Sequence, residues 1–154
     1  VKSVSAQTFA KFGPRGLGET DWGKGAIDPK KPFDVEDYGV ALLKLKSGKT
    51  VFLETSWAGH HAPDAREYGL DLHGTAAGLS LYPARLFRPG PSGYESIQLS
   101  LPIVSHSEDR IHHFVSCALE GKKPLVAPEE SLKVQQLLDA IYASAATGKE
   151  VRLT

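Results

Sequence analysis

VEDYGVALLKLKSGKTVFLETSW, residues 35–57, contains two runs of strand-forming residues separated by a short turn. The first run extends from Val35 to Lys46 and the second from Thr50 to Trp57, and both are rich in aliphatic and aromatic side chains. The connection Ser47-Gly48-Lys49 has the length and the glycine that are typical of a β-hairpin loop. This segment therefore predicts an antiparallel hairpin.

Both faces of the predicted hairpin are apolar. Successive side chains of a strand point to opposite faces, so Val40 and Leu42 lie on one face while Ala41 and Leu43 lie on the other. Monomeric proteins rarely expose large contiguous apolar patches. We therefore expect helices to cover one face and a partner subunit or a further domain to cover the other.

The chain continues outward from the hairpin as strands and then as helices. Alternating residues predict a strand over 1–10, and glycine and proline predict a long loop over 13–34. The patterns beyond the hairpin predict strands over 67–73, 79–81, 85–87 and 94–101, a helix from Ser105 to Gly121 with a Ser105/Glu108 capping box, a helix from Pro128 to Gly148, and a closing strand over 149–153. This order predicts an α+β fold, with an open mixed, mostly antiparallel sheet and two main helices packed on one face.

The composition excludes several classes of protein. The 154 residues fit a single domain, 1–154, and 18 basic residues balance 18 acidic ones. A balanced charge offers no broad electrostatic field to nucleic acid or to an anionic membrane, and no apolar run is long enough for a membrane span. We expect neither partner and we expect a cytoplasmic protein. The single cysteine, Cys117, is predicted to be a small core residue.

A group of polar and aromatic residues follows the second hairpin strand. An indole offers a flat apolar face on which a sugar ring stacks, and the neighbouring side chains offer hydrogen bonds. The candidate substrate contacts are Trp57, His60, His61, Asp64 and Arg66, with Arg15 and Trp22 of the long loop as second candidates. The alternative is an exposed polar loop that binds no ligand.

The sequence contains no complete catalytic, metal-binding or nucleotide-binding set. The adjacent His60 and His61 would point to opposite faces of a strand, and no further cysteine, histidine or carboxylate stands at a diagnostic spacing from them and Asp64, so no metal is expected. Gly13-x-x-Gly16-x-Gly18 follows a strand but opens no helix, which argues against a nucleotide site. His112 and His113 are predicted to be surface or edge residues of the first helix rather than catalytic bases.

Several pieces of the chain, taken in order, resemble the C-terminal domain of the Gfo/Idh/MocA oxidoreductase family, named after glucose-fructose oxidoreductase, inositol dehydrogenase and a rhizopine-catabolism protein. They are Val35-Glu36-Asp37 before a strand and a Ser47-Gly48 turn, residues 54–58, residues 72–79, His113-Phe114, residues 121–124, residues 139–145 and Gly148-Lys149 before a final strand.

The resemblance implies a fragment of a longer two-domain enzyme. An NAD(P)-binding Rossmann domain, with the lysine and histidine that transfer protons, would lie upstream of Val1, so no catalytic residue is expected in this chain. The fragment alone is expected to be inactive and to bind no NAD or NADP. The resemblance also implies a homo-oligomer joined through the sheet face and a sugar, cyclitol or related polyol as substrate.

A second interpretation from another class stays open. The same sheet would serve a stand-alone dimeric binding or scaffold module without redox activity. The two interpretations differ in whether the coding sequence upstream of Val1 contains a glycine fingerprint, a Lys-Pro pair and an Asp-x-x-x-His segment.

Overall fold

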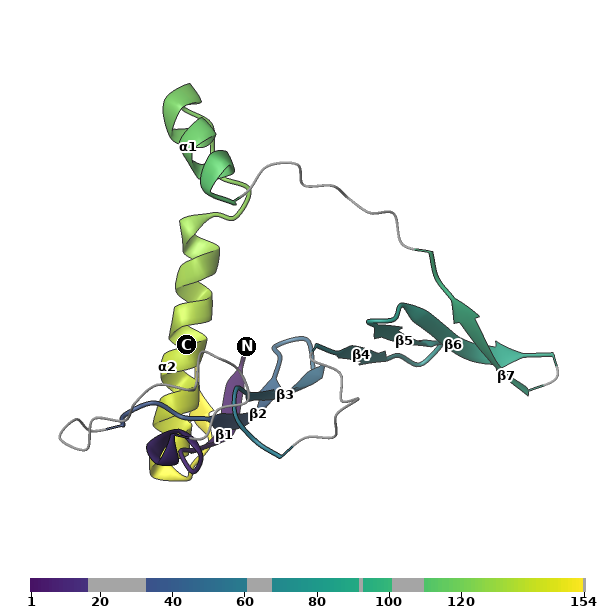
Figure 1. The fold of residues 1–154 in the computed structure, drawn as a ribbon. Helices are drawn as coiled ribbons and strands as arrows, with labels where there is room; N and C mark the ends of the chain where they lie inside the picture. Colours follow the sequence, from purple (N-terminus) through teal and green to yellow (C-terminus); the bar gives the residue numbers. More distant parts are fainter. Residues whose placement is uncertain (17–32, 61–67, 92, 101–109, 154) are drawn as a thin grey trace. The chain divides into compact units, whose positions relative to one another are not determined.

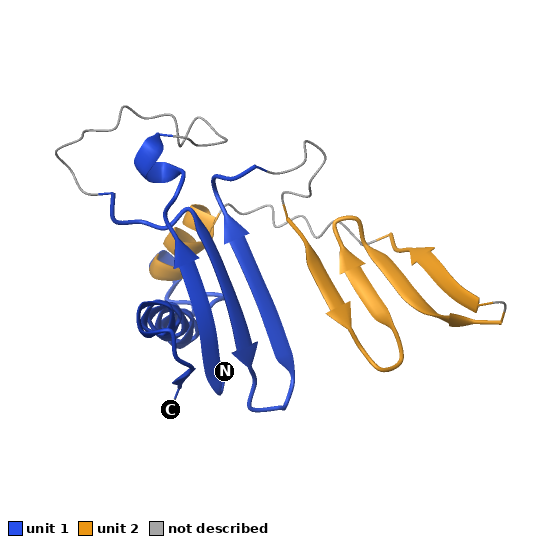
Figure 2. Cartoon of the chain, turned by 90° about the horizontal axis from the view of Figure 1, so that it is seen from below, with its two compact units in different colours: residues 1–60, 119–154 blue, residues 61–118 orange. Residues whose placement is uncertain are grey.

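The computed structural model describes residues 1–16, 33–60, 68–91, 93–100 and 110–153. These residues form two compact units (Figures 1 and 2). Unit 1 comprises Val1–His60 and Leu119–Thr154, and unit 2 comprises His61–Ala118. The two helices and the antiparallel strands within the described ranges confirm the predicted α+β class.

Unit 1 contains sheet A, whose strand order is β3-β2-β1-β8. Its strands are β1 (Ser3–Phe9), β2 (Tyr38–Lys44), β3 (Thr50–Ser56) and β8 (Val151–Arg152), and all pairings are antiparallel. The predicted hairpin is confirmed as β2 and β3, with Leu42 opposite Phe52. Gly48 in its turn has a φ of 83°, a conformation that glycine adopts without steric cost.

One face of sheet A is covered by helix α2 (Pro128–Thr147), as Figure 2 shows. The helix begins at a proline, which suits the first helical position, and ends before Gly148, whose φ of 66° is a left-handed cap. Its Ala140 and Ile141 are buried against the sheet. Strand residues of the same face complete the core: Val4, Ala6, Ala41 and Leu43.

Ser144 of α2 extends the hydrogen bonding of β1 beyond its short pairing with β8. Among the described residues, strand β8 pairs with Ser3 and Val4, and Leu153 donates its N–H to the Lys2 carbonyl at 3.0 Å. The next inward residue, Ala6, donates its N–H to Ser144 Oγ at 2.9 Å, and this hydroxyl donates to the Lys149 carbonyl at 2.7 Å. Because Ser144 is 1% exposed, its hydroxyl takes the place of a missing strand partner inside the core.

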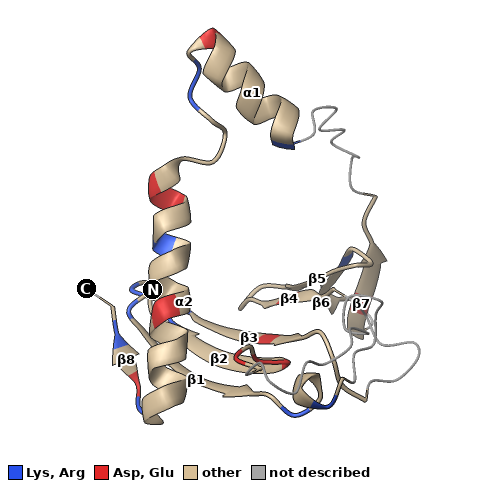
Figure 3. Cartoon of the chain, turned by 60° about the vertical axis from the view of Figure 1, so that its left-hand side comes forward, with Lys and Arg blue, Asp and Glu red and all other residues tan. Residues whose placement is uncertain are grey.

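The opposite face of sheet A carries large apolar side chains that the described residues of unit 1 do not cover. Residues paired across neighbouring strands share a face, which places Phe9 beside Tyr38 and Leu42 beside Phe52. Phe52 is 66% exposed and Leu42 is 41% exposed. Strands β1 and β2 carry few charges along their length (Figure 3). We call Phe9, Tyr38, Val40, Leu42 and Phe52 the open face.

Unit 2 contains sheet B, a meander in which each strand pairs with the next. Its strands are β4 (Leu70–His73), β5 (Gly78–Leu81), β6 (Arg85–Gly90) and β7 (Gly93–Gln98). The predicted positions of these strands agree with the structure to within a few residues. Helix α1 (Arg110–Glu120) ends before Gly121, which has a φ of 65°, and its Cys117 is buried.

The strands divide into two sheets where the sequence suggested one. Sheet B closes its pairing among consecutive strands, whereas β8 returns from the far end of the sequence to pair with β1. Strand alternation reveals the faces of a strand but not its neighbours, which is why this division was not predicted. The Ser105/Glu108 capping box and most of the predicted 13–34 loop lie outside the described residues.

Candidate functional site

The candidate site lies at one end of the strands of sheet A, where three chain segments come together. The pairings Phe9 with Tyr38 and Tyr38 with Ser56 place the end of β1, the start of β2 and the end of β3 side by side. A short 3-10 turn, η1 (Gly13–Arg15), follows β1 at this edge. We call this region the substrate edge, because two of the predicted substrate contacts, Trp57 and His60, lie there.

Asp37 holds the substrate edge together. Its side chain is 1% exposed, and its Oδ2 accepts hydrogen bonds from the backbone N–H groups of Lys11 at 2.5 Å, Phe12 at 2.5 Å and Gly13 at 3.0 Å. Its own N–H donates to the Phe9 carbonyl at 2.8 Å. One residue before β2 therefore fastens the turn that follows β1.

The ionised form of Asp37 is the favoured one. Burial of the carboxyl group acts to raise the pKa of Asp37, but the hydrogen bonds from Gly13, Phe12 and Lys11 outweigh it and hold this pKa below its usual value. Its second oxygen, Oδ1, is buried and has no hydrogen-bond partner within the part of the chain that the structure describes. The charge of Asp37 is thus stabilised by backbone dipoles on a single oxygen.

Trp57 is fixed to the same edge by its backbone and by its indole. Its N–H donates to the Asp37 carbonyl at 3.2 Å, and its Nε1 donates to the Glu36 carbonyl at 2.6 Å. The indole packs against Phe33, with ring centroids 6.2 Å apart, and stays 38% exposed. An indole held in this way presents a fixed apolar surface to solvent.

His60 lies on the other side of the anchored turn. Its ring meets the ring of Phe12 edge to face at a centroid distance of 5.2 Å. His60 itself is exposed, whereas Ala58 between it and β3 is 2% exposed and fixes the path of the chain. Ser56 Oγ lies 2.8 Å from the Ala58 carbonyl and 3.0 Å from the Asp37 carbonyl, and its hydroxyl donates to this pair.

Helix α2 reaches the substrate edge through Tyr142. Its hydroxyl donates to a carboxylate oxygen of Glu36 at 2.8 Å. This hydrogen bond, together with partial burial and the charge of Glu36, raises the pKa of Tyr142 above its usual value. Glu36 therefore contacts Trp57 through its carbonyl and Tyr142 through its side chain.

Two of the five predicted substrate contacts, Trp57 and His60, lie together at the substrate edge. His61, Asp64 and Arg66 lie outside the described residues, as does the second candidate Trp22. Arg15 is exposed at the end of η1, on the segment that Asp37 anchors. The role of these residues in substrate binding stays a prediction.

Sequence reasoning did not single out Asp37, Glu36, Phe12 or Phe33 as site residues. The only signal for Asp37 was its place: an aspartate immediately before a buried strand, inside the Val35-Glu36-Asp37 piece. The hydrogen bonds to residues 11–13 span 24–26 positions, and no local pattern encodes them.

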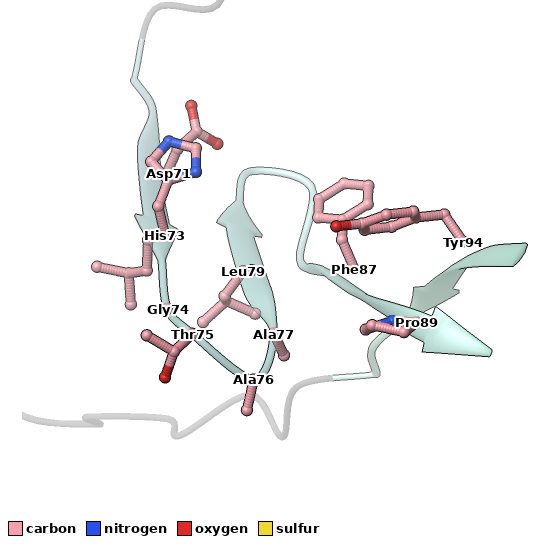
Figure 4. A pocket seen from close by; sticks show the side chains of 12 residues that line it. Asp71, His73, Gly74, Thr75, Ala76, Ala77, Leu79, Phe87, Pro89 and Tyr94 are labelled. Carbon is pink, nitrogen blue, oxygen red and sulfur yellow. The ribbon is translucent and has the colours of Figure 1, made fainter.

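Sheet B carries a separate hollow of about 420 Å³ (Figure 4). The strand register sets His73, Gly78 and Phe87 in one row, and the missing side chain of Gly78 lowers the middle of that row. Asp71 and His73 lie on one side of the hollow, and the rings of Phe87 and Tyr94 on the other. Its lining residues are all from unit 2.

The described residues form no metal site, and the Gly13–Gly16 segment does not form a nucleotide site. Within the described ranges, no three His, Cys, Asp or Glu side chains are grouped so that they could hold a metal ion. The Gly13–Gly16 segment does not fit a pyrophosphate, because the Gly13 N–H donates to Asp37 and the Gly16 N–H donates to the Gly13 carbonyl at 2.9 Å. None of the described helices is both long and apolar enough to cross a membrane.

The chain matches a family of known domains over nearly its whole length. The model for the Gfo/Idh/MocA C-terminal domain, described as "Oxidoreductase family, C-terminal alpha/beta domain", matches residues 2–153.

Curated relatives are dehydrogenases that are much longer than this chain. D-glucoside 3-dehydrogenase of Escherichia coli (strain K12) is 28% identical over 156 residues, which cover 99% of this chain and 42% of the relative. D-apiose dehydrogenase of Paraburkholderia graminis is 25% identical over 139 residues, covering 77% of this chain and 35% of that protein. The chain thus spans less than half the length of either relative.

Solved structures share the fold. A levoglucosan dehydrogenase in complex with NADH and L-sorbose superposes with a TM-score of 0.67 at 17% identity, covering 99% of this chain and 44% of that one. An oxidoreductase from Agrobacterium radiobacter in complex with NAD⁺, L-tartaric acid and magnesium gives a TM-score of 0.60 at 22% identity, with coverages of 99% and 43%.

Proposed function

The chain belongs to the C-terminal domain family of the Gfo/Idh/MocA oxidoreductases, and from this premise we propose that it is the substrate-contacting and subunit-joining domain of an NAD(P)-dependent dehydrogenase. The substrate is a sugar, a cyclitol or a related polyol. The observation that carries the proposal is the family match over residues 2–153. The names of the two curated relatives, which refer to a glucoside and to apiose, support this class of substrate.

The substrate edge contributes binding surface to this reaction rather than its chemistry. Trp57 offers the apolar face of its indole to a sugar ring, and His60 offers ring nitrogens to hydroxyl groups. His61, Asp64 and Arg66 follow them directly in sequence and complete the proposed set of contacts. A nicotinamide cofactor, held by a nucleotide-binding domain elsewhere in the full protein, would supply the hydride chemistry, and that domain would also carry the proton-transferring groups.

The open face joins two copies of the chain. Phe9, Tyr38, Val40, Leu42 and Phe52 form a largely apolar strip across β1, β2 and β3. Glu54 lies opposite Val40 on the same face and accepts a hydrogen bond from the Tyr38 hydroxyl. A strip of this kind is favourable to bury, at about 25 cal/mol per Å² of apolar surface. Self-association would cover it without requiring any other protein.

The decisive experiment is a dehydrogenase assay of the full-length protein. NAD⁺ and NADP⁺ are each supplied with a panel of aldoses, glycosides and cyclitols, and reduced nicotinamide is followed by absorbance. We expect turnover with at least one member of the panel. We also expect Trp57→Ala and His60→Ala to raise KM about tenfold or more while kcat changes little, because uniform binding is lost.

An exposed lysine on the same unit is the matched control. Lys49 lies in the β2–β3 turn, at the far end of the hairpin from the substrate edge, so Lys49→Ala should leave KM unchanged. Absence of turnover with every substrate and both cofactors would reject the dehydrogenase. A stable dimer of the full-length protein without any nicotinamide binding would favour the alternative, a dimeric binding or scaffold module.

A further inference from the structure

We propose that Asp37 is a positioning residue for Trp57 and His60, and that its carboxylate acts as an internal anion for the backbone N–H groups of residues 11–13. This inference rests on the proposed function for its effect on substrate, but its effect on the position of Trp57 is independent of that function. Asp37 touches neither substrate nor cofactor in this proposal.

The three N–H groups around Asp37 Oδ2 form a site built for negative charge. Hydrogen bonds from N–H groups to an ionised carboxylate are stronger than those to a neutral acceptor. Here Lys11, Phe12 and Gly13 all donate to one oxygen that is removed from water. Without the carboxylate, these three N–H groups would lose their common acceptor.

An asparagine cannot replace this carboxylate without loss. Its amide oxygen would accept from the three N–H groups, but its NH₂ would then occupy the position of Oδ1. That position is buried, and Oδ1 has no hydrogen-bond partner there among the described residues, so the structure shows no partner for an NH₂ group. A buried donor that is left unsatisfied costs about 1–3 kcal/mol. Asp37→Asn should therefore weaken the anchor, and Asp37→Ala should remove it.

The anchor is coupled to both substrate contacts by short links. On one side, Phe12 donates its N–H to Asp37 and packs its ring edge-on against His60. On the other side, the Asp37 carbonyl accepts from the Trp57 N–H, and the adjacent Glu36 carbonyl accepts from the indole Nε1. Release of the turn therefore frees His60 from its aromatic neighbour and loosens the backbone that holds Trp57.

The first experiment measures the position of Trp57 without any substrate. The chain has two tryptophans, so the full-length protein carries Trp22→Phe, and any tryptophan in its other parts is likewise replaced by phenylalanine. Asp37→Asn and Asp37→Ala are compared with Asp139→Asn, which makes the same change at an exposed carboxylate of α2 that accepts a hydrogen bond from Gln135 at 3.0 Å. We expect Trp57 emission to shift to longer wavelength and acrylamide quenching to increase in the Asp37 variants alone.

The second experiment supplies the missing anion. Formate has the size of the carboxyl group that Asp37→Ala removes. Added formate should return the emission of Asp37→Ala toward that of the parent protein and should not change Asp139→Asn. With a substrate identified by the dehydrogenase assay, KM should rise about 10- to 100-fold in Asp37→Ala while kcat changes less, since misplaced binding groups cost this much. Formate should lower KM again.

Each outcome supports or overturns the proposal. Folded Asp37 variants with unchanged Trp57 emission and unchanged KM would overturn it. So would global unfolding of both variants, because Asp37 would then serve the stability of the whole unit rather than the placement of two contacts. An emission shift with formate rescue, in a protein that turns over none of the sugars, would uphold the positioning of Trp57 and reject the proposed function alone.

Discussion

Replacement of Ser144 by alanine is expected to lower the free energy of unfolding of unit 1 by about 2–4 kcal/mol. The Ser144 hydroxyl is buried and satisfies the Ala6 N–H and the Lys149 carbonyl. Loss of the hydroxyl leaves the Ala6 N–H buried without a partner, at about 1–3 kcal/mol. Lys149 is exposed, so water can reach its carbonyl, and only the net value of one hydrogen bond is lost there, about 1 kcal/mol.

The assay is urea denaturation followed by circular dichroism, with Ser131→Ala as the control. Ser131 is exposed on the same helix, so the two variants share the gain in helix propensity and differ in the buried hydroxyl. The difference between their unfolding free energies therefore reports the hydrogen bonds to β1 and Lys149. Amide exchange at Ala6 should accelerate in Ser144→Ala alone. A difference below about 0.5 kcal/mol, the usual range of surface substitutions, would refute the view that this hydroxyl replaces a strand partner.

Other features of unit 1 give further expectations. Phe52→Glu on the open face should weaken self-association of the full-length protein at least tenfold in sedimentation experiments. Lys49→Glu in the neighbouring turn should leave self-association unchanged. If both substitutions had the same effect, the open face would be rejected as the interface. Gly48→Ala should lower the free energy of unfolding by about 1–2 kcal/mol, because a φ of 83° is costly for a residue with a Cβ. Gly48→Asn should lower it less. An unchanged free energy of unfolding of Gly48→Ala in urea titrations would contradict backbone strain at this position. The pKa of Asp37 is lowered by hydrogen bonds that outweigh its burial, and the pKa of Glu150 is lowered by the Ser3 hydroxyl and then by Lys44. Both carboxyl groups therefore stabilise the fold above about pH 4, the pKa range of unfolded carboxyl groups, and this stability is lost as the pH falls through their pKa values in the folded protein. Asp37→Asn should reduce the loss of stability in acid titrations. An unchanged midpoint of acid unfolding would argue against this contribution of Asp37.

Much of the fold was predictable because its local signals agree. The β2–β3 hairpin has two runs of strand-forming residues and a glycine at the turn position that adopts a positive φ. Helix α2 has a proline at its start and a glycine after its end. Such signals act within a few residues, and a single sequence contains them in full.

The candidate site was predictable only where it coincides with a strand end. Trp57 and His60 come just after the end of β3. They were predicted because aromatic and polar residues that follow a strand end are typical of a binding loop. The residues that hold them were not found, because Asp37 acts through backbone N–H groups 24–26 positions away. Every residue except proline has a backbone N–H group, so a sequence pattern does not show which of these groups will bind the carboxylate.

The division of the strands into two sheets was also hidden. A strand with two apolar faces indicates burial on both sides but does not name its neighbours. Within the described residues the two sheets are separate because β3 pairs with β2 and β4 pairs with β5, while no pairing joins β3 to β4.

The hydrogen bond between Ala6 and Ser144 joins residues 138 positions apart, and this separation sets an order of events during synthesis. At about 5–20 residues per second, roughly 7–28 s pass between the addition of Ala6 and that of Ser144. During that interval the inward side chains of β1 and β2 have no helix to cover them, while all of sheet B has already been made. The inner face of sheet A is therefore left uncovered until α2 has been made, so the core of unit 1 can form only after residues 128–147 have been synthesised.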